Sequence, residues 1–164
     1  MKWMDIAFVP SAEAVSALNE AWDWEFDQPV QPFLSSMFGG VFFAAPDGIV
    51  RWFECGTGLV EDVAASRAAF DTFLGGERDA TWEARVDEWF LPGFVSQLRA
   101  EGLQPASHQC YGLTILPIFE GGTYSADNVF VCSIQEWFSH TGNIHRQVAD
   151  IPDGGSVRLV VVTP

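Results

Sequence analysis

Short alternating runs of apolar and polar residues in the first half of the chain are typical of strands joined by tight turns. Residues 41–45 and 49–54 are β-prone, and the Pro-Asp-Gly sequence between them is typical of a hairpin turn. A third β-prone run, residues 59–64, follows a Cys-Gly-Thr-Gly sequence. The pattern therefore predicts an antiparallel meander in this part of the chain.

The apolar spacing then changes to a helical period. Ser66 fits an N-cap for a helix that the glycines at 75 and 76 end. A second helix is predicted over residues 79–90, and Pro92 then begins a third, which Gly102 ends.

The two ends of the chain complete the pattern. Near the N-terminus, Ser11 predicts a helix that runs to about residue 22, and the two prolines within residues 27–33 predict an extended linker. Strands are expected over residues 110–119, interrupted by a proline, and from residue 129. The S-x-x-E spacing of Ser133 and Glu136 predicts a capping box and a helix to about residue 149. A final strand over residues 156–162 is expected to be central and buried.

The order of these elements argues for an α+β fold, because strands cluster before and after a helical block instead of alternating with helices. We expect a mixed, largely antiparallel sheet with helices packed on it. The length of 164 residues fits a single domain. We assign residues 1–34 to an N-terminal helical arm and residues 35–164 to the α+β domain.

The hydrophobic content, 48% of residues, excludes a disordered chain. No apolar run approaches the roughly 20 residues that span a bilayer. The N-terminal sequence is also a poor secretory signal. We therefore expect a cytoplasmic protein that does not enter a membrane.

The net charge of −14 argues against nucleic acid as a partner, because phosphate binding requires lysine and arginine. The same charge favours a basic protein partner and speeds encounter with it. Solubility alone explains the charge equally well. Acidic and aromatic residues are interleaved in the arm, which is typical of a protein-contact segment. Its candidate contact residues are Trp22, Asp23, Trp24 and Glu25, although the aromatic side chains would also serve to dock the arm on the domain.

The residues that commonly perform catalysis form no strong pattern. The three cysteines are far apart and form no CxxC motif, so neither a disulfide framework nor a zinc site is expected. His108 and Cys110 could share one face of a strand, but no third group orients them. His140 and His145 differ by about 140° around a helix, so no metal site is predicted. The paired glycines match no phosphate-binding loop, so no cofactor is predicted.

Residues 118–130, IFEGGTYSADNVF, form a polar, glycine-shaped loop between two apolar runs. Loops of this kind are turns or recognition surfaces. The candidate contact residues here are Glu120, Tyr124 and Asp127.

Most of the chain resembles the C-terminal domain of bacterial type VI secretion immunity proteins that neutralise DNase effectors, a domain long catalogued as one of unknown function. The resemblance covers residues 35–162 and includes the hairpin of residues 39–58. Its motifs are a Tyr-Gly strand, a P-I-x-x-GG-x-Y-x-x-D-N segment, a helix ending G-x-I-H-x-Q and an I-P-D-G turn. These motifs lie at residues 111–112, 117–128, 142–147 and 151–154. The sequence differs from the pattern at Phe119 and Glu120, where aliphatic or small residues are expected.

The resemblance implies a non-catalytic immunity protein that neutralises a cognate toxin by direct binding, with a nuclease as one class of toxin. The contact residues above come from their chemistry and not from the family. One alternative is a small hydrolase or transferase that uses Cys110 and His108. A second alternative is a homo-oligomeric adaptor.

Overall fold

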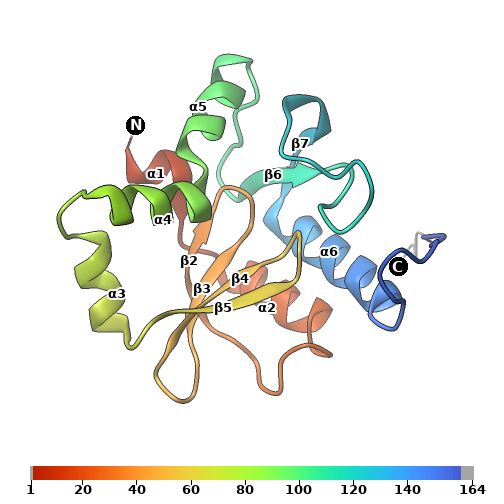
Figure 1. Cartoon of the computed structure of the whole chain (residues 1–164), viewed down its shortest axis with the longest axis horizontal. Helices are drawn as coiled ribbons and strands as arrows, with labels where there is room; N and C mark the ends of the chain where they lie inside the picture. The colour runs from red at the N-terminus through yellow and green to blue at the C-terminus, as the bar shows by residue number, and fades with distance from the viewer. Residues whose placement is uncertain (1, 160–164) are drawn as a thin grey trace.

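The protein has an α+β fold in one domain, as expected (Figure 1). The computed structural model describes residues 2–159. Five strands form an antiparallel sheet in chain order: β1 Ala7–Phe8, β2 Pro32–Ser36, β3 Val41–Ala44, β4 Val50–Glu54 and β5 Leu59–Ala64. Two more strands, β6 Gln109–Leu113 and β7 Val129–Ser133, form a separate antiparallel pair. The helices are α1 Trp3–Ile6, α2 Ala12–Ala21, α3 Arg67–Leu74, α4 Ala80–Phe90, α5 Pro92–Ala100 and α6 Ile134–Val148, with a 3-10 turn at Ala126–Asn128.

The predicted hairpin and third strand are confirmed. In the turn between β3 and β4, the Gly48 N–H donates to the Ala45 carbonyl at 2.8 Å, and Gly48 has a φ of +84° that favours glycine. Local sequence also sets the helix starts. The hydroxyls of Ser11, Ser66 and Ser133 accept hydrogen bonds from backbone N–H groups in the first turns of α2, α3 and α6, and Glu136 completes the predicted capping box.

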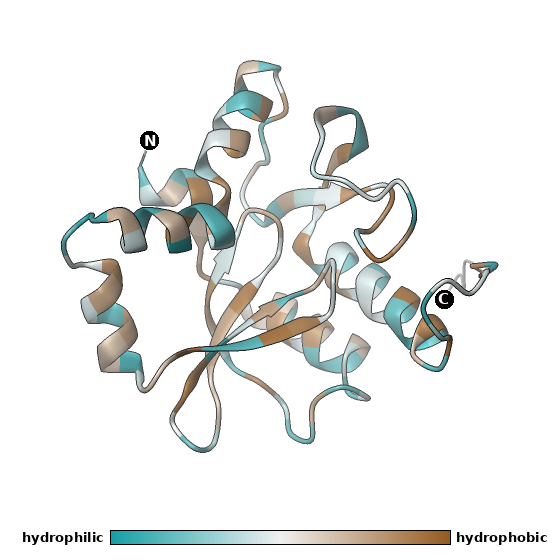
Figure 2. Cartoon of the chain, viewed as in Figure 1, coloured by the Kyte–Doolittle hydropathy of each residue, from teal (hydrophilic) through white to brown (hydrophobic). Residues whose placement is uncertain are grey.

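Both faces of the five-stranded sheet are covered. On one face, Phe42 of β3 contacts Phe70 of α3 and Trp89 of α4, with ring centroids 4.7 and 5.2 Å apart. On the other face, Phe53 of β4 contacts Trp22 at the end of α2, with centroids 4.7 Å apart. Helix α6 packs on α2 on this second side (Figure 1). In Figure 2 the helices alternate between hydrophobic and hydrophilic segments, as expected when one stripe of each helix faces a core.

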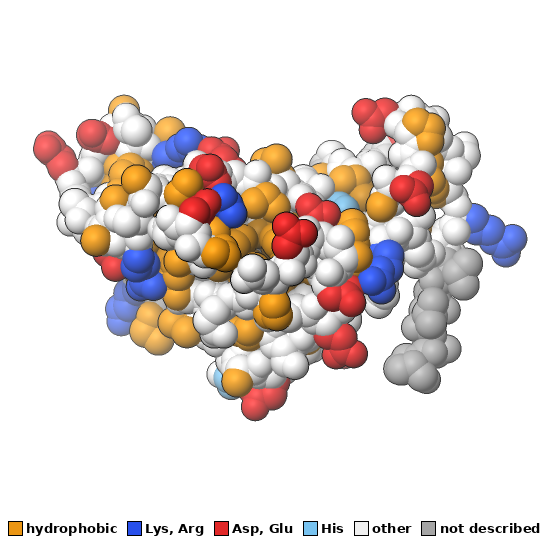
Figure 3. All heavy atoms as spheres, turned by 90° about the horizontal axis from the view of Figure 1, so that it is seen from below, with side chains coloured by type: hydrophobic (Ala, Val, Ile, Leu, Met, Phe, Trp, Pro, Cys, Tyr) orange, Lys and Arg blue, Asp and Glu red, His pale blue; other side chains and the backbone are white. Residues whose placement is uncertain are grey.

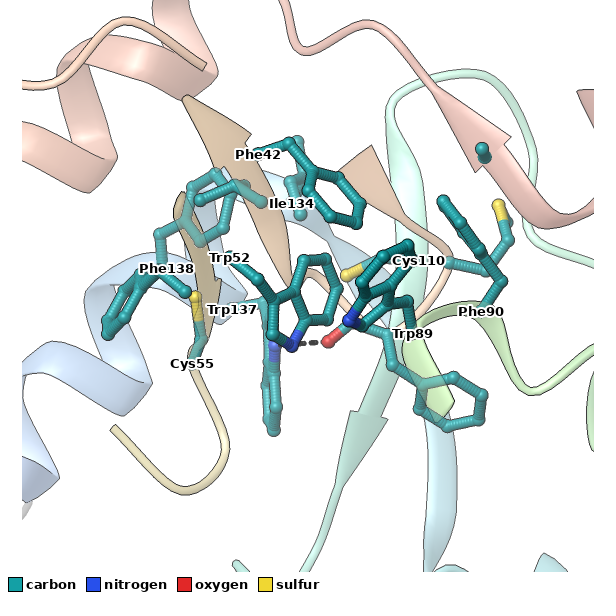
Figure 4. Close-up of a cluster of buried hydrophobic side chains, with 14 of the residues drawn as sticks. Phe42, Trp52, Cys55, Trp89, Phe90, Cys110, Ile134, Trp137 and Phe138 are labelled. Carbon is teal, nitrogen blue, oxygen red and sulfur yellow. Dashed lines mark hydrogen bonds between the residues drawn. The ribbon is translucent and has the colours of Figure 1, made fainter. Parts of the chain in front are cut away.

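The second strand pair joins the same core through α6. Figure 4 shows Ile134, Trp137 and Phe138 of α6 in the same cluster of buried side chains as Phe42 and Trp52 of the five-stranded sheet. The indole N–H of Trp137 donates to the Phe38 carbonyl at 3.1 Å, 99 residues away in the chain. The Tyr111 N–H of β6 donates to the Met37 carbonyl at 2.7 Å. The two sheets are therefore connected by buried hydrogen bonds as well as by apolar packing.

The N-terminal segment differs from the separate arm expected over residues 1–34. Strand β1 pairs with β2, with Ala7 opposite Ser36, and Trp22 is buried in the core. The predicted linker also ends early, because Pro32 begins strand β2. Proline is tolerated at a strand start, where its missing N–H breaks no ladder bond. Residues 2–34 thus supply strand β1, helices α1 and α2 and core side chains to the domain.

Two strands predicted in the second half also differ. The strand expected over residues 110–119 ends at Leu113, and the chain then turns, with the Phe119 N–H donating to the Leu116 carbonyl at 2.9 Å. Residues 156–159 of the predicted final strand are exposed and irregular, and residues 160–162 lie outside the described residues. Within residues 2–159, no helix has the length and apolar character needed to cross a bilayer.

Candidate functional site

An open hollow of about 380 Å³ lies between the loop after α2 and the α2–α6 side of the sheet. We call it the acidic hollow. Its lining combines acidic, apolar and amide side chains with one arginine: Glu25, Phe26, Asp27, Gln28, Val30, Phe43, Ala45, Pro46, Arg51 and Val60.

Asn19 and Phe26 fix the loop that forms one wall of the acidic hollow. The Asn19 side chain accepts a hydrogen bond from Val30 N–H at 2.7 Å and donates one to the Val30 carbonyl at 2.9 Å. The Phe26 ring meets the rings of Phe43 and Phe53 edge-on, with centroids 5.6 and 5.0 Å apart. Because Phe26 points into the protein, Glu25 and Asp27 on either side of it are left exposed. The wall is therefore held in place before any partner arrives.

The charge of the acidic hollow is negative. Arg51 is bound by two carboxylates, Asp47 and Asp62, each at 2.8 Å, so its charge is already compensated. No ion pair within the described residues involves Glu25 or Asp27. Partial burial raises the pKa of Glu25, which means that its charged form lacks full hydration. The acidic hollow therefore has two carboxylates without an ion-pair partner among the described residues.

Acidic side chains without an ion-pair partner also occur outside the acidic hollow. Five arginines form the seven ion pairs of residues 2–159, and these pairs use seven of the 22 acidic residues. The remaining 15 carboxylates have no ion-pair partner in that part of the chain. On the face seen in Figure 3, acidic side chains border stretches of apolar surface and basic side chains are fewer. The cations are therefore mostly engaged within the molecule, and the field outside it is negative.

The structure corrects one of the four contact residues predicted near α2. Trp22 is only 1% exposed, and its ring lies between Trp24, Phe53 and His145, so it cannot touch a partner. The alternating acidic and aromatic pattern did not show which side chains face inward.

The other three residues of this segment differ in their surroundings. Trp24 is half-buried, stacks on Trp22 and donates its indole N–H to the Ala21 carbonyl at 3.1 Å. Asp23 is exposed and forms an ion pair with Arg146 at 2.7 Å. Glu25 is the one residue of the seven predicted contacts that lines the acidic hollow.

The second predicted segment is a folded loop with three exposed candidate residues. Glu120 and Asp127 are exposed, and Tyr124 is 38% exposed with its ring against Phe38 at 5.4 Å. The Tyr124 hydroxyl donates to the Glu54 carboxylate at 3.2 Å, and burial together with this carboxylate raises the pKa of Tyr124 far above its usual value. Tyr124 therefore stays protonated and acts as a hydrogen-bond donor.

Asn128 organises this loop from inside. Its side-chain oxygen accepts from Ile115 N–H at 2.9 Å, and its amide group donates to the carbonyls of Ile115 and Thr123 at 2.9 and 2.8 Å. The side chain is buried, so these bonds are not open to exchange with water. The sequence places Asn128 only within a polar loop and gives no signal of its three side-chain hydrogen bonds.

The turn of residues 54–58 connects the two predicted segments. Besides Tyr124, the Glu54 carboxylate accepts hydrogen bonds from the N–H groups of Gly56 and Thr57, both at 2.9 Å. The Nε2 atom of His145 lies 3.1 Å from the Gly56 carbonyl, and the His145 ring lies 5.0 Å from that of Trp22. Burial lowers the pKa of His145. Local sequence gives no signal of the contact between Glu54 and Tyr124 or of that between His145 and Gly56, because these partners are 70 and 89 residues apart in the chain.

Cys110 and His108, the two residues that the enzyme alternative requires, do not form a hydrogen-bonded pair. Cys110 is buried, and burial raises the pKa of its thiol well above the ordinary value. His108 is exposed in the left-handed region, with a φ of 64°, and no hydrogen bond joins it to Cys110 within the described residues. In residues 2–159 no three His, Cys, Asp or Glu side chains converge as metal ligands do.

Comparison with known proteins gives no match, either to a protein-family model or to a curated protein.

Proposed function

We propose that this protein is a non-catalytic binding protein that receives a basic segment of a protein partner at the acidic hollow. The observation that carries the proposal is the placement of Glu25 and Asp27 over an apolar floor, with the one arginine of the site already compensated. Lysine and arginine side chains match such a surface, because each has an apolar stem and a cationic head.

We further propose that the partner is a cognate toxin and that the protein acts as its immunity protein. The resemblance of residues 35–162 to immunity domains of type VI secretion suggests this class. A nuclease toxin carries a basic surface for phosphate, and an acidic protein competes for that surface. The remaining uncompensated carboxylates would steer the encounter over longer distances. Binding of this kind requires no catalytic residue in the protein itself.

The test is affinity capture of partners from the native host at low and high salt, followed by mass spectrometry. Three forms of the tagged protein are compared: the wild type, a Glu25→Gln and Asp27→Asn double variant, and a Glu77→Gln and Asp87→Asn double variant. Both variants lose two negative charges, but the exposed residues 77 and 87 do not line the acidic hollow. We expect the wild type and the second variant to capture a basic protein with a toxin domain.

The purified partner then allows a kinetic comparison. We expect the association rate of the wild type to fall as salt rises, because screening weakens steering beyond about 10 Å at 0.1 M salt. The variant at positions 25 and 27 should associate more slowly than its matched control and dissociate faster. Equal kinetics for the two variants would exclude the acidic hollow as the contact site. A stable homodimer in sedimentation, with no captured partner at either salt, would favour the adaptor alternative.

A further inference from the structure

Two cysteines that are distant in sequence meet in the hairpin of β6 and β7. Cys110 and Cys132 are directly opposite in the antiparallel register, and their Sγ atoms are 4.0 Å apart. Residues opposite each other on antiparallel strands have Cα atoms about 4.5–5.5 Å apart, within the range that a disulfide spans. Side-chain rotation can therefore bring the two sulfur atoms to bonding distance without a shift in strand register.

The two thiols have different surroundings. Cys110 is buried, and burial raises the pKa of its thiol. Cys132 is partly exposed, and a hydrogen bond from Cys110 lowers its pKa, although the partial burial of Cys132 and the nearby Glu136 carboxylate both oppose this effect. A partly exposed thiol beside a second, shielded thiol is the arrangement found in proteins that sense oxidants.

We propose that Cys110 and Cys132 form a modification site at which hydrogen peroxide produces an intramolecular disulfide. In the first step the Cys132 thiolate attacks one oxygen of the peroxide, the O–O bond breaks, and Cys132 sulfenic acid forms with release of hydroxide. In the second step the Cys110 thiol gives up its proton and its sulfur attacks the Cys132 sulfur; the S–O bond breaks, and the departing hydroxide takes that proton and leaves as water. In total the two cysteines lose two electrons, which reduce the peroxide. One peroxide oxygen leaves as hydroxide and the other as water. The hydroxide takes up the proton that Cys132 lost when its thiol ionised.

The third cysteine provides an internal reference. Cys55 is buried, its thiol donates to the Gly39 carbonyl at 3.1 Å, and burial raises its pKa. It lacks both the exposure and the neighbouring donor of Cys132, so it should remain reduced. The disulfide would close residues 110–132 into a loop that includes Asn128 and Tyr124. Cross-linking a loop of this length restricts the unfolded chain and should raise Tm by about 5–10 °C.

The experiment treats the purified full chain with hydrogen peroxide, at a dose that oxidises glutathione, and maps the peptides. We expect an intact mass lower by two hydrogens, a Cys110–Cys132 link, and Cys55 that is alkylated only after unfolding. Dithiothreitol should restore the original mass. These readouts use the wild-type protein, so they do not depend on the folding of a variant.

Two variants separate the roles of the thiols. With Cys132→Ala, the buried Cys110 should stay reduced under the same treatment. With Cys110→Ala, sulfenic acid should persist on Cys132 and be trapped by dimedone. The proposal is overturned if the wild type forms no link, if Cys132 proceeds directly to sulfinic acid, or if links between molecules predominate. This site is independent of the proposed partner binding, and either one can fail without the other.

Discussion

The Tyr124 hydroxyl and the Glu54 carboxylate form a hydrogen bond of 3.2 Å between residues 70 positions apart in the chain. Because Glu54 also binds the N–H groups of Gly56 and Thr57, one carboxylate holds both its own turn and the loop that contains Tyr124. The contribution of Tyr124 can be divided into its hydroxyl and its ring.

Tyr124→Phe should lower the free energy of unfolding by about 0.5–1 kcal/mol, because it removes one hydrogen bond while Glu54 keeps its backbone partners. Tyr124→Ala should cost about 2 kcal/mol, because it also removes the ring that packs on Phe38. Urea unfolding of both variants measures the two losses. Equal losses would show that the ring contributes nothing.

Asn128→Ala should destabilise the protein by about 2–3 kcal/mol. It leaves the Ile115 N–H and the carbonyls of Ile115 and Thr123 without the partner that Asn128 provides. Asp127→Ala is the matched control, because Asp127 is the exposed neighbour in the same short turn and should change stability by less than about 0.5 kcal/mol. Hydrogen exchange should show faster exchange at Ile115 only in the Asn128 variant. A similar cost for both variants would mean that the turn, and not the buried amide, holds the loop.

Gly142→Ala should destabilise the contact between α2 and α6. A Cβ at position 142 would lie 2.6 Å from the Ala21 carbonyl oxygen and 2.7 Å from the Ala21 Cβ, so the helices would have to separate. Overpacking of this kind costs about 1–3 kcal/mol. Gly93→Ala, in α5, is the control: a Cβ there meets no atom within 4 Å and should stabilise the helix by about 0.4–1 kcal/mol. Thermal unfolding should shift in opposite directions for the two variants.

His145 should make stability depend on pH. Burial lowers its pKa, so the unfolded chain binds a proton more readily than the folded protein does. Its contribution to stability is complete above about pH 6.5, the ordinary pKa, and is lost as the pH falls from there toward the folded-state pKa. His140 has a pKa lowered in the same way.

The check is urea unfolding between about pH 7.5 and 5.5, above the range in which carboxylates titrate. His145→Gln should reduce the slope of stability against pH, and adding His140→Gln should reduce it further. The slope is compared instead of the absolute stability, because a buried substitution also changes packing. An unchanged slope in the double variant would place the pH dependence elsewhere.

Sequence predicted the parts of the fold that short segments determine. The β3–β4 hairpin depends on a Pro-Asp-Gly turn, and the starts of α2, α3 and α6 depend on serine caps within four residues of their partners. The fold class followed from the order of these elements. Strands β1 and β2 were missed, because β1 has only two residues and Pro32 resembles a linker residue.

The candidate site was predicted less well, because it depends on contacts between distant segments. The alternation of acids and aromatics around Trp22 and Glu25 is the same whichever side faces the core. Only the packing of the Trp22 ring on Phe53 and His145 shows that Trp22 is buried and that Glu25 is exposed. Likewise, the pairing of Cys110 with Cys132 depends on the register of β6 and β7, which the long loop between them does not reveal.

The packing of α2 against α6 has a consequence for synthesis of the chain. The meander of β2 to β5 can form as soon as a continuous segment of about thirty residues has emerged, because its strands pair in chain order. Ala14 and Leu18 on the inner face of α2 lack their partner helix until residues 134–148 have been translated. A nascent chain that stops before α6 therefore exposes an apolar surface that chaperones recognise, and docking of α6 is the step that completes the fold.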